Sequence, residues 1–162
     1  MFSTDLLARA ENLLTAARAG GVRIATAESC TGGLIAALLT EIPGSSDVFG
    51  RGFVTYSNKA KEDMLGVPAA TLRQYVAVSE AVARIMAEGA IRNSTAQLSV
   101  AVTGIAGPGG GTDEKPVGLV HIAVARAGEP TLHRECRFGD IGRNEVRLKS
   151  VETALEMLQS LV

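Results

Sequence analysis

Two spacings of apolar residues alternate along the chain. Between Leu6 and Ala17 they recur every three to four positions, which predicts an amphipathic helix that Gly20-Gly21 ends. Alternating or continuous apolar runs predict strands at 22–26, 49–56, 97–103, 117–125 and 132–138. Further helices are expected at 31–40, 59–65, after the N-cap residue Ser79 and from Arg143 onward, with a short helix or turn at 68–74 and a turn at 43–46.

Helices that interleave with strands indicate an α/β fold, and we expect a three-layer α/β/α sandwich around a mixed, mostly parallel sheet. The chain has 162 residues, 46% of them hydrophobic, and this size fits a single domain over residues 1–162 with a proper core. No repeat, linker or low-complexity tract interrupts it.

Charge and composition exclude several classes of partner. The net charge is −1, with two tyrosines, four phenylalanines and no tryptophan, so neither a basic nucleic-acid footprint nor a base-stacking platform is expected. No apolar run predicts a membrane span, and the N-terminus lacks the pattern of a signal peptide. Cys30 and Cys136 lack metal-ligand spacing, so we expect no metal and free thiols in a reducing cytoplasm.

The segment TAESCTGG at 26–33 is the first candidate for chemistry, because it stands where a strand turns into a helix. Backbone N–H groups at a helix start lack intrahelical partners and suit an anion or a developing oxyanion. Ser29 is therefore a candidate nucleophile. The alternative is structural: Ser29 or Thr31 caps the helix, and Gly32 and Gly33 allow close packing.

Two further segments are candidates. Thr103 opens the glycine-rich run TGIAGPGGG, whose backbone N–H groups could approach a phosphate, although no P-loop or dinucleotide motif is present. Lys59 and Lys61 follow Tyr56, and a desolvated lysine can act as the base for a serine nucleophile, whereas exposed lysines on a helix are the commoner case.

Basic residues elsewhere leave alternatives open. Arg143 and Arg147 lie one helical turn apart and could bind an anion or pair with surface carboxylates. The only histidines, His121 and His133, lack an obvious acidic partner, and we expect them to be structural.

Several stretches together resemble the CinA C-terminal domain family, whose stand-alone members are nicotinamide-nucleotide amidohydrolases. They are TAESCTGG (26–33), PGSS (43–46), RGFVTYSNKAK (51–61), VSE (78–80), TGIAGPGGG (103–111), EKPVG (114–118) and GD (139–140). The resemblance implies a metal-independent enzyme that hydrolyses the carboxamide of nicotinamide mononucleotide to nicotinate mononucleotide and ammonia. We expect this enzyme to be cytoplasmic and to need no cofactor. Longer members carry an additional N-terminal domain, and we expect this chain to be of the stand-alone type.

The same resemblance implies roles for individual residues. The nucleophile falls on Ser29 and the general base on Lys61, with Tyr56, Ser46 and Thr103 close by. The N–H groups of Thr31, Gly32 and Gly33 would stabilise the oxyanion. From charge and position, and not from the resemblance, we expect Gly104 and Gly107 of the glycine-rich loop, together with Arg143, to hold the ribose phosphate of a pyridine nucleotide.

Two departures from the family pattern and two other functions remain open. Ile141-Gly142 interrupts the usual GD-to-Arg step, which leaves the assignment between Arg143 and Arg147 open. Lys59 replaces a residue that is often acidic, and a second cation close to Lys61 would depress its pKa further. The alternatives are a thiol amidase with Cys30 as nucleophile and a histidine as base, and a non-catalytic nucleotide- or partner-binding module. A homo-oligomer is plausible.

Overall fold

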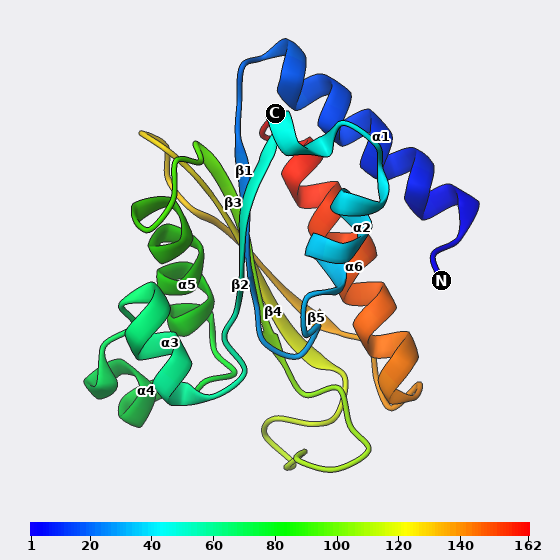
Figure 1. Cartoon of the computed structure of the whole chain (residues 1–162). Coiled ribbons are helices and arrows are strands. Elements are labelled where there is room, and N and C mark those ends of the chain that lie inside the picture. The colour runs from blue at the N-terminus through cyan, green and yellow to red at the C-terminus, as the bar shows by residue number, and fades with distance from the viewer.

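The computed structural model describes all 162 residues and consists of one five-stranded sheet between two layers of helices (Figure 1). Helices α3, α4 and α5 cover one face, and α1, α2 and α6 cover the other. The helices are α1 (Thr4–Ala19), α2 (Leu34–Glu41), α3 (Asn58–Leu65), α4 (Ala69–Tyr75), α5 (Glu80–Arg92), α6 (Arg143–Gln159) and the 3₁₀ turn η1 (Ser45–Asp47). The strands are β1 (Ile24–Glu28), β2 (Phe49–Val54), β3 (Leu98–Gly104), β4 (Leu119–Arg126) and β5 (Leu132–Arg137).

The sheet has the strand order β2-β1-β3-β4-β5 and is mixed, as expected. Strand β1 pairs in parallel with both β2 and β3, whereas β4 is antiparallel to both β3 and β5. Four strands therefore run in one direction and β4 alone runs in the other. The three-layer α/β/α architecture is confirmed.

Alternation along the central strands separates two cores of different character. On the face covered by α1, α2 and α6, the strands present large aliphatic side chains such as Ile24, Val100 and Ile122. On the face covered by α5 they present small ones, among them Ala27 and Ala123. Side chains of successive residues point to opposite faces of a strand, and the small residues let α5 lie close to the sheet.

The boundaries around the TAESCTGG segment differ from the sequence-based prediction. Strand β1 continues to Glu28, because Ala27 and Glu28 still pair with both neighbouring strands. Helix α2 begins at Leu34, three residues later than expected, since Gly32 and Gly33 have φ values of 57° and 97°. Left-handed backbone at these two glycines keeps the segment after Ser29 out of the helix.

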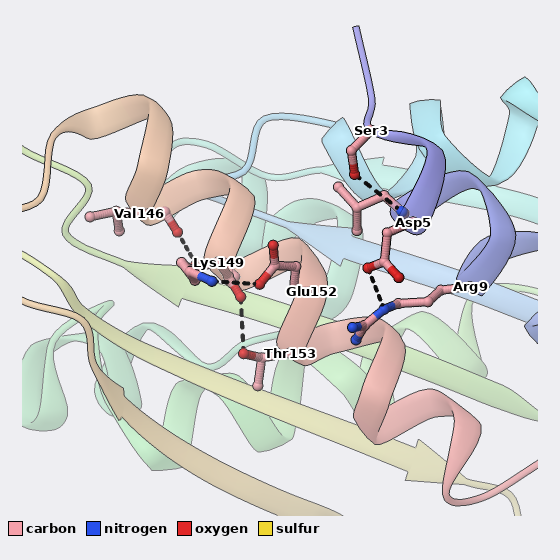
Figure 2. A network of polar contacts seen from close by, with 9 residues as sticks. Ser3, Asp5, Arg9, Val146, Lys149, Glu152 and Thr153 are labelled. Atoms are coloured by element: carbon pink, nitrogen blue, oxygen red, sulfur yellow. Dashed lines mark hydrogen bonds and ion pairs between the residues drawn. The ribbon is translucent and has the colours of Figure 1, made fainter.

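Pairs of polar residues close in sequence form hydrogen bonds and ion pairs on α1 and α6 (Figure 2). The Ser3 hydroxyl accepts from the Leu6 N–H at the start of α1, and Arg9 pairs with Asp5 one turn away. On α6, Lys149 pairs with Glu152. Each such pair supports its own helix by only about 0.2–0.5 kcal/mol, so the apolar core holds α1 and α6 together. None of the helices combines the length and apolar content needed to cross a membrane.

Gly89 of α5 sets how closely α3, the helix that carries Lys61, approaches. A Cβ at this position would lie 2.1 Å from the carbonyl oxygen of Leu65 at the end of α3. We expect Gly89→Ala to lower the free energy of unfolding by about 1–3 kcal/mol, because the clash with backbone outweighs the helix propensity of alanine. Urea unfolding measures this, with Gly50→Ala as control, since a Cβ at Gly50 meets nothing within 4 Å. Equal stability of the two variants would contradict the close packing.

Candidate active site

Three parallel strands bring the candidate segments together at one edge of the sheet. Ser29 directly follows β1, Thr55 and Tyr56 follow β2, and Gly104 ends β3. The connection from β1 to β2 crosses one face of the sheet, and the connection from β2 to β3 crosses the other face. The strand order therefore reverses at β1, which lies between β2 and β3. In open α/β sheets, ligands bind at the carboxyl ends of strands at such a switch point.

The side chains of Ser29 and Lys61 meet at this edge. The Lys61 Nζ lies 3.0 Å from the Ser29 Oγ. The same nitrogen lies 2.8 Å from the carbonyl oxygen of Thr55 and 3.4 Å from that of Tyr56. Helix α3 begins immediately after these carbonyls, with Ser57 as its N-cap. The first turn of α3 therefore carries Lys61 back over the end of β2 to reach Ser29.

Lys61 is a buried amine without a carboxylate partner. Its side chain is only 1% exposed, and no acidic group forms an ion pair with it. Burial lowers its pKa from the usual value near 10.5. A neutral amine has two N–H groups and one lone pair. In this neutral form, donation to the two carbonyls leaves the lone pair for the hydrogen of the Ser29 hydroxyl, whereas the protonated amine donates to Ser29 Oγ.

Lys59 does not influence this amine in the way expected from the sequence. Its Nζ lies 2.8 Å from the Asp63 carboxylate on the exposed side of α3, and this partner raises the pKa of Lys59. Residues two apart on a helix point in different directions. The condition for a further lowering of the Lys61 pKa, a second cation close by, is therefore not met, and burial is the effect that lowers it.

Glu28 occupies the helix start that the sequence analysis assigned to an anion. This fully buried carboxylate accepts hydrogen bonds from the N–H groups of Ile35 (2.9 Å) and Ala36 (3.0 Å). The N-cap residue of α2 is Gly33, and no side chain of the segment after Glu28 caps the helix. The alternative that Ser29 or Thr31 serves as the cap is therefore wrong.

Ser29 begins a tight turn instead. The Gly32 N–H donates to the Ser29 carbonyl oxygen at 3.0 Å, so this N–H is not available to a substrate. The N–H groups of Cys30 and Thr31 donate to no oxygen of the protein, although both residues are buried. These two N–H groups, one and two residues after the candidate nucleophile, are the available donors of the turn.

A cavity of about 220 Å³ adjoins the Ser29–Lys61 pair. Ser29, Lys61, Tyr56, Thr103, Gly104 and Arg143, all proposed from the sequence, lie on its wall. Cys30, Asn58, Ala77, Val78 and Ala106 complete the lining. The Thr103 hydroxyl donates to the Ala77 carbonyl oxygen at 2.9 Å, which links two residues of the wall.

The two arginines of α6 have separate positions. Arg143 lines the cavity, donates to the Gly107 carbonyl oxygen at 2.7 Å and lies 3.0 Å from the Tyr56 hydroxyl. Arg147 lies behind the turn and donates to the carbonyl oxygens of Cys30 and Thr31. Only Arg143 of the pair is placed at the cavity.

Several predicted residues are not brought to this cavity. Ser46 is exposed in η1, before β2, and β2 starts opposite the beginning of β1, whereas Ser29 follows the end of β1. A strand of five residues spans roughly 17 Å, so the expectation that Ser46 lies close to Ser29 is wrong. The cavity is also not lined by Thr31, Gly32, Gly33 or Gly107. The Gly107 carbonyl oxygen accepts a hydrogen bond from Arg143, which does line it.

The sulfur at Cys30 is poorly suited to nucleophilic attack. Burial raises the pKa of its thiol to about 12, which keeps it protonated near neutral pH. No histidine lines the cavity. His121 and His133 stack on each other with ring centroids 5.1 Å apart, and the expectation that neither has an acidic partner is wrong for His133, whose Nδ1 lies 3.6 Å from a Glu80 carboxylate oxygen. A thiol mechanism with a histidine base has no support in this geometry.

Sequence reasoning missed some residues of the site. Glu28 stands inside the first motif, yet its place at the start of α2 depends on Gly32 and Gly33 delaying the helix. Asn58 and Val78 belong to the motifs at 51–61 and 78–80, but the sequence predicts no role for either residue. For Val78, the signal was its place just before the N-cap residue Ser79, where a helix start faces the strand ends.

Comparison with known proteins identifies the family of this chain. Residues 7–162 match the profile of the CinA C-terminal domain. The chain is 48% identical to the nicotinamide-nucleotide amidohydrolase PncC of Escherichia coli (strain K12) over 98% of its own length and 95% of the relative's. A CinA-like protein of Anaeromyxobacter dehalogenans (strain 2CP-1) is 54% identical over 87% of this chain, which corresponds to 34% of that longer protein.

A solved structure also resembles this chain over nearly its full length. The competence/damage inducible protein CihA from Agrobacterium tumefaciens superposes with a TM-score of 0.97 at 56% sequence identity, and the match covers 99% of this chain and 98% of the other. The match extends over the helices and strands that form the site as well as the core. The chain therefore belongs to the CinA C-terminal domain family.

Proposed function

We propose that this protein is an amidohydrolase that converts nicotinamide mononucleotide into nicotinate mononucleotide and ammonia with Ser29 as nucleophile and Lys61 as general base. One observation carries the proposal: a buried lysine without a carboxylate partner lies 3.0 Å from a serine hydroxyl on the wall of a cavity. Serine activated by a neutral lysine is a recognised arrangement for acyl transfer. The near full-length similarity to PncC supports the substrate.

In the acylation step, Lys61 Nζ accepts the Ser29 proton while Oγ attacks the carboxamide carbon. The resulting tetrahedral intermediate carries a negative oxygen. Its collapse breaks the C–N bond, and Lys61 returns the proton to the departing nitrogen, so that ammonia leaves. Water then attacks the ester with Lys61 again accepting a proton, and the Ser29 hydroxyl is restored. Every proton passes through one nitrogen, whose orientation the carbonyls of Thr55 and Tyr56 fix.

We assign the oxyanion to the N–H groups of Cys30 and Thr31. They follow the nucleophile directly and have no oxygen acceptor within the protein. Thr31 itself does not line the cavity, but its N–H belongs to the peptide group that it shares with Cys30, which does. Donors held in place before reaction stabilise a developing anion without reorganisation, and each contributes about 2.7–4 kcal/mol. Of the residues assigned from the sequence, Thr31 is kept, Cys30 is added, and Gly32 and Gly33 are dropped; the Gly32 N–H already donates to the Ser29 carbonyl oxygen.

The rest of the nucleotide would extend from the cavity mouth. At about 220 Å³ the cavity is smaller than the roughly 300–1,000 Å³ of sites that enclose a drug-sized ligand. It suits the carboxamide-bearing ring and leaves ribose and phosphate outside. Arg143 at this mouth has no carboxylate partner, so its charge is available to a phosphate, and the Tyr56 hydroxyl orients it.

Ammonia release tests the proposed function directly. We expect the purified protein to release ammonia from nicotinamide mononucleotide in the presence of EDTA, since every proposed group belongs to the chain itself. Nicotinamide alone should be a poor substrate because it lacks the phosphate. A folded protein that binds the nucleotide without releasing ammonia would support the binding-module alternative, which gives no reason for the burial of Lys61 beside Ser29.

Replacing Arg143 should weaken substrate binding more than it slows the reaction. We expect Arg143→Met to raise KM for nicotinamide mononucleotide about 10- to 100-fold, as a charged hydrogen bond worth about 1.5–3 kcal/mol is lost. The KM for nicotinamide riboside, which has no phosphate, should change little. Steady-state kinetics with both substrates separates the effects, and a similar rise for both would place the phosphate elsewhere.

A further inference from the structure

Arg147 makes an unusual pair of contacts behind the turn that begins at Ser29. Its Nε and Nη2 each lie 3.1 Å from a carbonyl oxygen, those of Cys30 and Thr31 respectively. No carboxylate forms an ion pair with this guanidinium. Several other arginines of the molecule do pair with carboxylates, and they do so on its surface. The side chain therefore serves two consecutive main-chain carbonyls that lie more than a hundred positions away in the sequence.

The geometry of the peptide group links these contacts to the oxyanion site. In a planar trans peptide, the C=O and the N–H point in opposite directions. The Cys30 carbonyl points toward Arg147 on the α6 side of the sheet. The Thr31 N–H belongs to the same peptide group and so points away from Arg147. Helices α6 and α3 lie on opposite faces of the sheet (Figure 1).

The next peptide group follows the same pattern. The Thr31 carbonyl points toward Arg147, and the Gly32 N–H at its other end donates to the Ser29 carbonyl oxygen. The Thr31 N–H has no such acceptor, although Thr31 is completely buried. Buried N–H groups without an acceptor are rare in folded proteins, and this one is held in its orientation from behind.

We propose that Arg147 is a positioning residue that holds the Ser29–Gly32 turn so that the Thr31 N–H points at the negative oxygen of the tetrahedral intermediate. The proposal rests on the proposed role of Ser29 as nucleophile. A guanidinium on the carbonyl also polarises the peptide group and strengthens its N–H as a donor. Arg147 thus acts on the reaction through Cys30 and Thr31 and does not touch the substrate.

This role differs from phosphate binding in what a substitution changes. Arg147→Met should lower kcat about 100-fold, the effect of losing one oxyanion donor, and leave KM within about threefold. Arg134→Met is the matched control, because Arg134 pairs with Glu156 on the surface and should keep wild-type kinetics. In Arg147→Ala, millimolar guanidinium ion should restore part of kcat, whereas in wild type it should not raise it.

A second readout does not depend on the carboxamide substrate. Diisopropyl fluorophosphate phosphorylates an activated serine: the Ser29 Oγ–P bond forms, the P–F bond breaks, fluoride leaves, and the Ser29 proton passes to Lys61. The transition state places negative charge on the phosphoryl oxygen, which uses the same donors. We expect Arg147→Met to slow this labelling about as much as it lowers kcat, and thermal unfolding confirms that the variant is folded.

The outcomes separate this inference from the proposed function. A raised KM with wild-type labelling would make Arg147 a phosphate ligand and overturn the inference. Wild-type kcat and labelling in the folded variant would also overturn it. Labelling of Ser29 without ammonia release would refute only the substrate, and the labelling rates would then decide the role of Arg147. Wild-type protein that resists labelling would overturn both.

Discussion

Ser29→Ala is expected to abolish ammonia release, with a loss of about four to six orders of magnitude in kcat. The hydroxyl supplies the oxygen that bonds to the carboxamide carbon, and the alanine side chain has no atom that can replace it. The variant should fold normally, because the Ser29 side chain has Lys61 as its only hydrogen-bond partner. Ammonia release and thermal unfolding, measured on the same preparation, check both halves of the prediction.

Cys30→Ala is the matched control for this variant. It changes the neighbouring side chain on the same turn, and the proposed oxyanion donor at this position is the backbone N–H, which alanine keeps. We expect ammonia release to stay within about tenfold of wild type, and iodoacetamide to react slowly with the native protein since burial keeps the thiol protonated. Turnover that survives in Ser29→Ala and disappears in Cys30→Ala would establish a thiol amidase.

Lys61→Met should lower kcat about 10³- to 10⁴-fold with little effect on KM. The thioether chain fills a similar volume but accepts no proton. Lys59→Met is the control, because Lys59 lies two residues away on the same helix, is exposed and pairs only with Asp63. Since Ser29 and Lys61 act as one unit, the double variant should be no slower than Ser29→Ala alone. Additive losses would indicate two independent roles.

The pH dependence of the wild type follows from the same lysine. Burial lowers the pKa of Lys61, and only the neutral amine can accept the Ser29 proton. The rate should therefore fall as the pH falls through this pKa and reach its plateau above it. The inflection should lie below 10.5, the ordinary value for lysine, and be absent from the residual activity of Lys61→Met. An inflection at or above 10.5 would contradict a desolvated base.

The helices and strands could be predicted from apolar spacing because each has one buried face. The 3.6-residue spacing from Leu6 to Ala17 and the alternation from Leu98 to Val102 both correspond to elements of the fold. The boundary at Ser29 could not be predicted in this way. Ala27 still belongs to the buried strand, and the two glycines after Thr31 delay the helix by adopting left-handed backbone, which leaves no hydrophobic signal.

The site was predictable where a motif fixes its residue and unpredictable where a long-range contact decides. Resemblance named Ser29 and Lys61, and the fold places them in contact. The contacts of Glu28 are local in sequence but depend on the delayed start of α2. Those of Arg147 reach across the fold to the turn after Ser29. Nothing in the local sequence reports such distant geometry. Ser46 shows the converse, because a motif residue lies at the other end of the sheet.

Trapping the acyl-enzyme tests the Ser29–Lys61 account most directly. Wild-type protein is mixed with nicotinamide mononucleotide, quenched in acid and digested with trypsin, which releases the peptide 24–51 with Ser29 and Cys30 side by side. Fragmentation between these two residues by mass spectrometry locates the adduct. We expect a nicotinate mononucleotide ester on Ser29 that accumulates and disappears with turnover. An adduct on Cys30, or turnover with Ser29 unmodified at every time of quenching, would contradict it.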